Sequence, residues 1–330
     1  MTEIAAPSPD SRPSSRPPNP SPRIAELDFA QRARDPQAFG AALVDGMRET
    51  GFIVIRNHTL PQAAIDAVEA ASRDFFALPA AVKSRYAMPE HHFQRGYSPF
   101  GQESAKGRDA PDLKEFWHVG RATIPGLPGT PAVTERPAFT QAGQALFDAM
   151  DAFARTLMEA VGTALEMAPD RVQALLDNGN SILRLLHYPP MPQEEGADGA
   201  GSSVRAAAHE DINLLTLLLG AEEAGLEVRH RSGVWLPINA PTGSLVVNAG
   251  DMLDRLTGGV IPSTTHRVVN PTRARAPHSR YSMPFFLHPA QDFLLEALPK
   301  CLEMGGTATT PITAHGYLEE RLREIGLKTG

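Results

Sequence analysis

Short apolar runs separated by turn residues fill the second half of the chain. After Gly179 these runs follow one another closely, and Arg231-Ser232-Gly233 between two of them is typical of a hairpin turn. Many short strands joined by turns predict a β-sandwich or a jelly roll. The runs are SILRLLHY, NLLTLLL, GLEVRH, GVWLPI, SLVVN, STTHRVV and SRYSMPFFL.

The first half of the chain shows helical spacing instead. Asp35 can cap a helix, and Pro36 suits the first position of the helix that follows. A short buried strand is expected at residues 52–55, a second helix at 61–76 and a long helix at 137–167. The apolar stripe of the long helix is expected to pack on a sheet and consists of Leu146, Met150, Phe153, Leu157, Val161 and Leu165.

Composition divides the chain into three segments. Residues 1–22 are dominated by proline, serine and alanine, and such a segment cannot bury enough apolar surface to offset its ordering entropy, so a disordered tail is expected. An N-terminal region is expected over residues 23–135, and a β core with its long supporting helix over residues 136–330. The polar, glycine-rich stretch 190–206 is too long for a plain connection, and such loops are often lids or disordered.

Charge and cysteine content limit which binding partners and which cellular compartment are expected for this protein. The net charge of −7 indicates no basic face, so nucleic acid is not expected as a partner. Cys301 is the only cysteine, which excludes an intrachain disulfide and fits a reducing compartment. No apolar stretch approaches the roughly 20 residues of a membrane span, and the N-terminus lacks an apolar signal core. A cytoplasmic protein without a membrane partner is predicted, and a monomer or a weak homo-oligomer is expected.

Two histidines and an aspartate form a candidate metal site. His209 and Asp211 are two residues apart, so in an extended segment both side chains project to one face, while Glu210 points the other way. His266 lies on a later predicted strand. A lone histidine is more often structural than a ligand, but two histidines with one carboxylate form a facial triad that leaves about three positions of an octahedral ion open. This donor set suits Fe(II), and Zn(II) takes similar ligands.

Arg280 and Ser282 are a candidate anchor for a bound acid. In a strand these two side chains share a face, where a guanidinium fork and a hydroxyl match a carboxylate. An arginine paired with one of the chain's own acids is the alternative. The position of Arg280 after His266 favours an anchor for the far carboxylate of a metal-bound oxo-acid.

The sequence resembles the isopenicillin N synthase-like group of Fe(II)/2-oxoglutarate-dependent dioxygenases, from about residue 23 to 325. The order and spacing of the matching segments would be very improbable by chance. In the N-terminal half these are GFIVIRNH (51–58), FFALP (75–79), GYSPFG (96–101) and DLKEFWHVG (112–120). In the C-terminal half they are LRLLHYPP (183–190), HEDINLLTLLL (209–219), LVVNAGDML (245–253), RLTGGVIPSTTHRVVNP (255–271) and RYSMPFFLHP (280–289).

The resemblance implies a mainly β fold with flanking helices around a double-stranded β-helix core, a cupin-like jelly roll. It implies that His209, Asp211 and His266 bind Fe(II), and that Arg280 and Ser282 hold the distal carboxylate of the cosubstrate 2-oxoglutarate. Tyr188 of the Tyr-Pro motif is expected to hydrogen-bond the same oxo-acid. The reaction would consume O₂, release succinate and CO₂, and hydroxylate, desaturate or cyclise a small organic substrate.

Two other functions stay open at this point. One is an Fe(II) oxidase of the same scaffold that does not use 2-oxoglutarate, like isopenicillin N synthase or ACC oxidase. The other is a jelly-roll binding protein without redox chemistry. The Arg-x-Ser motif does not exclude the oxidase, whereas the triad together with the anchor argues against the binding protein.

Departures from the family pattern and the other histidines complete the expectations. The family often has Asn-Tyr-Tyr-Pro where this chain has Leu186-His187-Tyr188-Pro189, so one polar contact near the cosubstrate is expected to be absent. His187 is expected to point away from Tyr188 and bind no metal. Residues 273–278 are expected as an insertion. Asn248 and Asp251 are expected to fix a turn. Structural roles are expected for His58, His118, His288 and His315, and a place near the substrate pocket is considered for His91 and His92.

Overall fold

The computed structural model describes residues 23–102, 114–190, 206–219, 225–269 and 278–324. Its centre is a large sheet of nine strands that runs in the order β1-β2-β10-β7-β13-β5-β4-β3, with β12 also paired to β5. These strands are β1 (Ala25–Asp28), β2 (Phe52–Arg56), β3 (Gly96–Ser98), β4 (Glu115–Gly120), β5 (Ile182–Tyr188), β7 (Leu215–Leu219), β10 (Leu245–Ala249), β12 (Arg280–Ser282) and β13 (Phe285–Leu287).

A small sheet faces the large one and has the strand order β6-β11-β8-β9. Its strands are β6 (Ala206–His209), β8 (Leu226–Arg229), β9 (Trp235–Pro237) and β11 (His266–Val268). The predicted hairpin is confirmed, because β8 and β9 pair antiparallel across a turn in which Gly233 has a φ of +87°. A third sheet joins β14 (Leu294–Leu295) and β15 (Ile312–Thr313).

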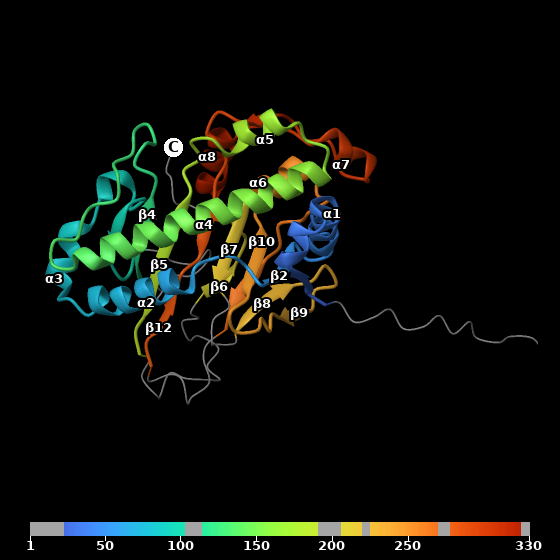
Figure 1. Cartoon of the computed structure of the whole chain (residues 1–330). Coiled ribbons are helices and arrows are strands. Elements are labelled where there is room, and N and C mark those ends of the chain that lie inside the picture. The colour runs from blue at the N-terminus through green and yellow to red at the C-terminus, as the bar shows by residue number, and fades with distance from the viewer. Residues whose placement is uncertain (1–22, 103–113, 191–205, 220–224, 270–277, 325–330) are drawn as a thin grey trace, which may run out of the picture.

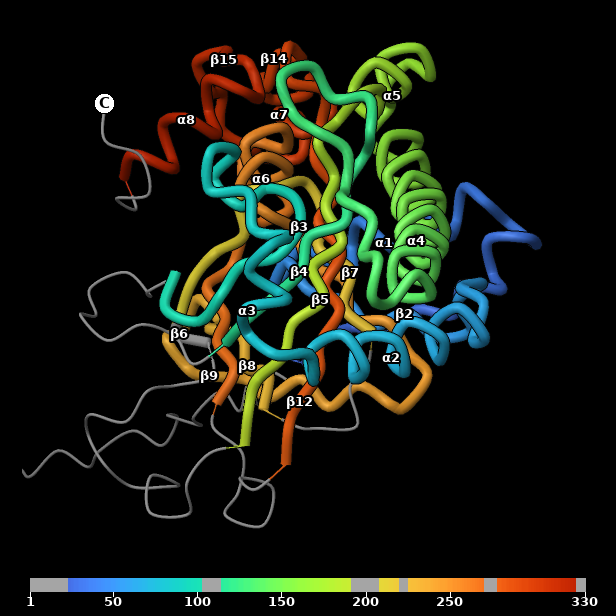
Figure 2. The backbone as a smooth tube through the Cα atoms, turned by 90° about the vertical axis from the view of Figure 1, so that its left-hand side faces the viewer, coloured from blue at the N-terminus to red at the C-terminus, as the bar shows by residue number. Residues whose placement is uncertain are grey.

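Helices cover one side of the large sheet, and the small sheet lies on the other (Figures 1 and 2). The covering helices are α1 (Pro36–Met47), α2 (Gln62–Phe76) and α4 (Pro137–Ala164), and α4 packs against the other two. The remaining helices are α3 (Ala80–Lys83), α5 (Pro169–Leu176), α6 (Asp251–Thr257), α7 (Pro299–Glu303) and α8 (Ala314–Glu324), with 3₁₀ turns η1 (Phe29–Ala33), η2 (Ser84–Tyr86) and η3 (Pro89–His91).

Local sequence explains these helices well. The Asp35 carboxylate accepts a hydrogen bond from the Ala38 N–H at 2.9 Å, and Pro36 begins α1 as predicted. All six residues of the predicted α4 stripe are buried in the main core. The helix ends at Ala164, three residues earlier than expected, because Glu166 turns into the left-handed region with a φ of 57°.

Alternation along the strands gives the large sheet two different faces. The outer face carries Leu183, Leu217 and Phe285, which are fully buried in the core beneath α4. We call the opposite side, which looks toward the small sheet, the inner face. It carries Phe52 and Val246, which form a second apolar cluster with Val228 of the small sheet. Polar residues of the same face, described below, lie beside this second cluster.

Several expectations fall on residues outside the described ranges. These are the disordered tail 1–22, nearly all of the 190–206 loop and all but the last residue of the 273–278 insertion. Among the residues that the structure describes, no helix combines the length and apolar character that a membrane crossing requires.

Candidate metal centre

Strand pairing brings the predicted metal-binding residues together. His209 ends β6, His266 begins β11, and these antiparallel strands place the two residues directly opposite each other. The Nε2 of His209 lies 3.8 Å from Oδ1 of Asp211, and the Nε2 of His266 lies 3.9 Å from Oδ2. All three ligand atoms fall within 4.8 Å of one another. Ligands that each lie about 2.1 Å from one ion are roughly 3 to 4 Å apart, so the cluster has nearly the required size.

The cluster is buried on one side and open on the other. The side chains of Asp211 and His266 are each 9% exposed, whereas that of His209 is 48% exposed. His266 donates a hydrogen bond from Nδ1 to the carbonyl oxygen of Thr264 at 3.1 Å, which leaves the Nε2 lone pair toward Asp211. Because one side of the cluster is exposed, other molecules could reach a metal ion that these residues hold.

Two inner-face residues orient the Asp211 carboxylate. Its Oδ2 accepts hydrogen bonds from the Thr216 hydroxyl at 2.6 Å and from the Asn248 amide at 2.9 Å. Thr216 and Asn248 are register partners on β7 and β10. Asn248 therefore holds a candidate ligand rather than a turn, which corrects the expectation from sequence. Asp251 does support a turn, because its N–H donates to the backbone oxygen of Asp211 at 2.7 Å.

Electrostatics keep Asp211 ionised. Burial by itself raises the pKa of Asp211, but the imidazoles of His266 and His209 lower it. Hydrogen bonds to Oδ2 from Thr216 and Asn248 lower it further, so the pKa lies below the usual value of a carboxyl. A buried carboxylate with two imidazoles is a donor set that fits a divalent cation, and Fe(II) in particular.

The predicted anchor residues also meet on the inner face. Arg280 is the register partner of Tyr188, and Ser282 is the partner of Leu186. The Arg280 guanidinium carbon lies 5.7 Å from the centroid of the Tyr188 ring, and both residues are buried. This is the same sheet face that carries Thr216 and Asn248, so the anchor and the metal cluster share one side of the large sheet.

His187 points to the outer face, as expected. Its Nδ1 lies 2.8 Å from Oε1 of Glu115, and its Nε2 lies 3.1 Å from the Ser279 hydroxyl. The ring stacks on Tyr281 at a centroid distance of 5.0 Å. His187 is therefore committed to a network behind the anchor strand, and the prediction that it binds no metal is consistent with this position.

Other histidines occupy varied environments. His118 is buried on the inner face, where its Nδ1 donates to the Phe93 carbonyl oxygen at 2.8 Å. Burial lowers the pKa of His288 to about 4, so this ring is neutral at physiological pH. Burial also lowers the pKa of His58. His91 ends η3, His92 follows it with a φ of 51°, and their place near substrate stays a prediction.

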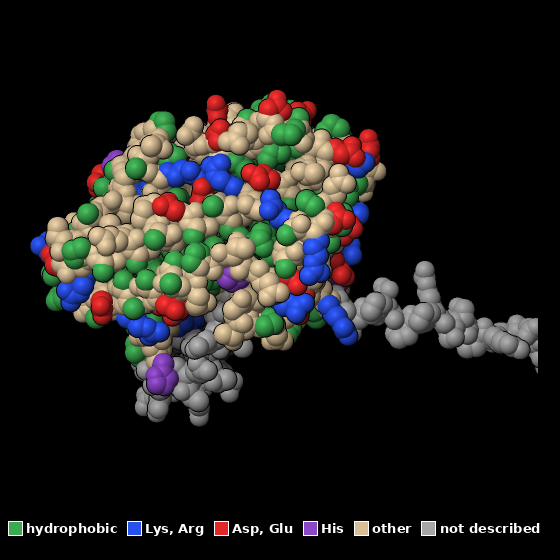
Figure 3. All heavy atoms as spheres, in the orientation of Figure 1, with side chains coloured by type: hydrophobic (Ala, Val, Ile, Leu, Met, Phe, Trp, Pro, Cys, Tyr) green, Lys and Arg blue, Asp and Glu red, His purple; other side chains and the backbone are tan. Residues whose placement is uncertain are grey.

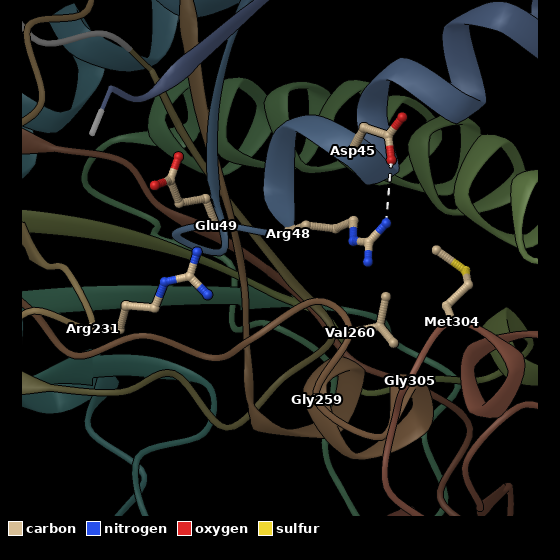
Figure 4. Close-up of a pocket in the computed structure, with 8 residues that line it drawn as sticks. All are labelled: Asp45, Arg48, Glu49, Arg231, Gly259, Val260, Met304 and Gly305. Carbon is tan, nitrogen blue, oxygen red and sulfur yellow. Dashed lines mark ion pairs between the residues drawn. The ribbon is translucent and has the colours of Figure 1, made fainter. Parts of the chain in front are cut away.

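The surface also has a hollow that is lined by a different set of residues (Figure 4). It has a volume of about 490 Å³, and an Arg48–Asp45 ion pair at 3.8 Å forms part of its wall. None of its lining residues belongs to the metal cluster or to the anchor. The hollow is therefore not evidence for the chemistry of the candidate metal site. The lining residues are Asp45, Arg48, Glu49, Arg231, Gly259, Val260, Met304 and Gly305.

Comparison with known proteins gives the family. Residues 24–138 match the model of the N-terminal region of the non-haem dioxygenase in morphine synthesis, and residues 179–289 match the 2OG-Fe(II) oxygenase superfamily. The chain is 31% identical over 325 residues to the 2-oxoglutarate-Fe(II) type oxidoreductase ppzD of Metarhizium rileyi, with 92% of this chain and 91% of that protein covered.

Solved structures agree with this match. A 2OG-Fe(II) oxygenase family protein from Caulobacter crescentus is 45% identical and has a TM-score of 0.82, covering 92% of this chain and 99% of that one. A full-length Neurospora crassa protein in complex with alpha-KG is 30% identical and has a TM-score of 0.80, covering 91% of this chain and 95% of that one.

Fold and site together define a non-haem iron oxygenase with a double-stranded β-helix core. The chain belongs to the 2OG-Fe(II) oxygenase superfamily, and it is an Fe(II)/2-oxoglutarate-dependent oxygenase. The predicted fold class, cofactor and cosubstrate are thereby confirmed, and O₂ is implied by the class. The findings favour this function over an oxidase that does without 2-oxoglutarate.

Proposed function

We propose that His209, Asp211 and His266 hold the iron, and that Arg280 and Ser282 hold the distal carboxylate of 2-oxoglutarate with help from Tyr188. The observation that carries the proposal is the convergence of the three ligand atoms within 4.8 Å on the sheet side that also bears Arg280. Bound Fe(II) would supply the activation of O₂ that amino-acid side chains cannot provide.

The chain's own residues would set the geometry of that site. Thr216 and Asn248 both donate to Oδ2 of Asp211, so the carboxylate cannot rotate freely when the metal is absent. Arg280 offers a permanently charged fork for a carboxylate, and the Ser282 hydroxyl adds a donor on the same face. The open side of His209 leaves access for the oxo-acid, the substrate and O₂.

The reaction that we propose oxidises a small organic molecule by hydroxylation, desaturation or cyclisation, with release of succinate and CO₂. Among the described residues, acidic and basic side chains are interspersed on the face shown in Figure 3, so that face presents no basic patch of the kind that binds nucleic acid. A cytoplasmic monomer or weak homo-oligomer, with an N-terminal region at 23–135 and a core at 136–330, remains part of this proposal.

Succinate release tests the ligand assignment. The protein is assayed with Fe(II), O₂ and 2-oxoglutarate, and slow succinate formation is expected even without the primary substrate. Asp211→Ala is expected to abolish it, because the buried anion of the donor set is lost. Asp148→Asn, which changes an exposed carboxylate on α4, serves as the control and should keep wild-type activity. Full succinate formation by Asp211→Ala would refute the assignment.

A further inference from the structure

Strand β12, which carries the anchor residues Arg280 and Ser282, has little backbone support. It is three residues long, and among the described strands it pairs only with β5 (Figures 1 and 2). The next strand, β13, pairs with both β5 and β7. Because a short strand with one neighbour makes few ladder hydrogen bonds, side-chain contacts contribute much of what fixes the position of β12.

A row of three side chains supports β12 on the outer face of the sheet. Glu115, His187 and Tyr281 are register partners on β4, β5 and β12. The His187 ring stacks on the Tyr281 ring at a centroid distance of 5.0 Å and an interplanar angle of 18°. Tyr281 stands between Arg280 and Ser282 in the sequence, so the stack holds the residue that separates the two anchor side chains.

Hydrogen bonds of His187 connect the same strand to a buried ion pair. The ionised carboxylate of Glu115 can only accept, so His187 donates to it from Nδ1, at 2.8 Å from Oε1. The other ring nitrogen, Nε2, lies 3.1 Å from the hydroxyl oxygen of Ser279, the residue directly before Arg280. Glu115 is 1% exposed, and its Oε2 lies 2.7 Å from the Lys83 ammonium. One imidazole thus links the start of β12 to a fixed point in the core.

We propose that His187 is a positioning residue for 2-oxoglutarate, although it lies on the face of the sheet opposite to the anchor. The imidazole fixes Ser279 and Tyr281, and thereby the place of β12. The donors of Arg280 and Ser282 are then aimed at the distal carboxylate before it binds. This inference rests on the function proposed above, because it adds a residue to the support of the same anchor.

Two substitutions separate the two bonds of His187. The amide nitrogen of asparagine can take the place of Nδ1, and the amide end of glutamine can take the place of Nε2. His187→Asn therefore keeps the bond to Glu115 and loses the link to Ser279, whereas His187→Gln does the reverse. Ser279→Ala removes the same link from the other side.

His230→Asn is the matched control. His230 also meets a serine, with Nδ1 at 2.8 Å from the Ser232 hydroxyl oxygen, and its side chain is 11% exposed, compared with 12% for His187. Its bond to Ser232 lies in the turn between β8 and β9 of the small sheet, whereas β12 belongs to the large sheet. The control therefore removes an equivalent bond without touching the support of the anchor.

The measurement compares two oxo-acids. The full chain with Fe(II) is titrated anaerobically with 2-oxoglutarate and with 2-oxopentanoate, and binding is read through the visible band. 2-Oxopentanoate has the same chain length and the same keto acid group, but it lacks the distal carboxylate and cannot use the anchor. The ratio of the two Kd values therefore reports on the anchor alone. Fe(II) affinity by calorimetry, and kcat and KM for 2-oxoglutarate, are measured on the same proteins.

Wild type is expected to prefer 2-oxoglutarate. His187→Asn and Ser279→Ala should each lower this preference about 3- to 10-fold, the effect of losing one hydrogen bond. Both variants should raise the KM for 2-oxoglutarate with little change in kcat, and should bind 2-oxopentanoate and Fe(II) as wild type does. His187→Gln should keep more of the preference than His187→Asn, and His230→Asn should match wild type.

Several results overturn the proposal while the oxygenase function stands. One is a wild-type preference in either His187→Asn or Ser279→Ala. Another is an equal loss of affinity for both oxo-acids, which would indicate a general loosening of the fold. A His187→Gln protein no better than His187→Asn, or a His230→Asn control that falls equally, would also overturn it. In each case wild type still shows the band and releases succinate. Absence of both from wild type would instead refute the proposed function.

Discussion

The carboxylate of Glu210 accepts a hydrogen bond from the Thr265 hydroxyl at 2.8 Å, and this bond joins the two segments that carry the candidate metal ligands. Glu210 stands between His209 and Asp211, and Thr265 precedes His266. The Glu210 carboxylate is not part of the His209–Asp211–His266 cluster, and its contact with Thr265 gives it a structural role. The hydrogen bond connects the segment that carries His209 and Asp211 to the segment that carries His266, where β6 and β11 pair.

Arg321 of α8 extends the same contact. It lies 3.8 Å from the Glu210 carboxylate and 2.9 Å from that of Asp251, whose N–H donates to the backbone oxygen of Asp211. The C-terminal helix is thus tied by charge to both sides of the segment that carries Asp211. Solvent screens these partly exposed ion pairs. We therefore expect Arg321 to contribute less than Thr265 to holding the segment that carries Asp211 in place.

Thr265→Val is expected to weaken metal binding. The change keeps the shape of the side chain and removes the donor to Glu210, so the two ligand segments lose their cross-link. Loss of a residue that supports a ligand typically costs about 10-fold or more in affinity. Anaerobic calorimetric titration of the metal-free protein with Fe(II) measures it. Thr156→Val, on the exposed side of α4, is the control, and equal affinities for the two variants would show that the bond is unimportant.

Arg280→Gln is expected to raise the KM for 2-oxoglutarate far more than it lowers kcat. The anchor would make a charged contact with the distal carboxylate before and during the reaction, so its loss removes mainly binding energy, about 10- to 100-fold. Arg73→Gln is a matched control. Arg73 of α2 stacks over the ring of Tyr281, which projects from the face of β12 opposite to Arg280. A change of similar size in Arg73→Gln, or none in Arg280→Gln, would contradict the assignment.

Glu115→Gln is expected to destabilise the fold strongly. Glu115 and Lys83 form a 2.7 Å ion pair whose side chains are 1% and 7% exposed, and the Tyr97 hydroxyl donates to the same carboxylate. Leaving the Lys83 charge buried without its partner costs about 3 to 5 kcal/mol. Urea unfolding compares this variant with Glu159→Gln on the surface of α4. The double change Lys83→Met with Glu115→Gln should recover part of the loss.

The same carboxylate has a defined pH dependence. Burial raises the pKa of Glu115, but the hydrogen bonds from His187, Lys83 and Tyr97 outweigh it, and the pKa lies below the usual value. The ionised form is therefore preferred in the folded state. The stabilisation is present above the pKa of the unfolded chain and is lost as the pH falls through the folded-state pKa.

His288 makes the metal-free protein less stable in mild acid. Burial lowers its pKa from 6.5 to about 4, so between these values the unfolded chain binds a proton that the folded chain does not. The free energy of unfolding thus falls as the pH drops from 6.5 to 4, by up to about 3 kcal/mol. Urea unfolding at pH 7 and pH 5 should show a smaller difference for His288→Gln than for wild type. His315→Gln, an exposed histidine, should behave like wild type, and a His288→Gln protein that does so as well would refute this role.

The fold class and the metal cluster could be predicted because both leave local patterns. His209, Asp211 and His266 are chemically distinctive residues on recognisable strand segments. Thr216 and Asn248 left no such pattern, since their contact with Asp211 depends on the register of β7 against β10. A threonine in a leucine run looks like ordinary strand composition.

Arg184 illustrates the same limit for the inner face of β5. The sequence LRLLHYPP marks a strand, but nothing in it distinguishes an arginine that faces solvent from one that faces the inner side of a sheet. The pairings of β5 with β4 and β13 decide that, and they also bring His118, Phe116 and Phe286 around it. These partners are 66, 68 and 102 residues away in the chain, beyond the reach of any local pattern.

Anaerobic titration of the full chain with Fe(II) and 2-oxoglutarate, read by visible absorption, tests the proposed centre most directly. Chelation of the iron by the oxo-acid is expected to give a charge-transfer band in the wild type. The band should be absent from Asp211→Ala at any Fe(II) concentration that saturates wild type, and Arg280→Gln should restore it only at higher 2-oxoglutarate. A band of normal intensity and affinity in Asp211→Ala would contradict the assignment of His209, Asp211 and His266 as the iron ligands.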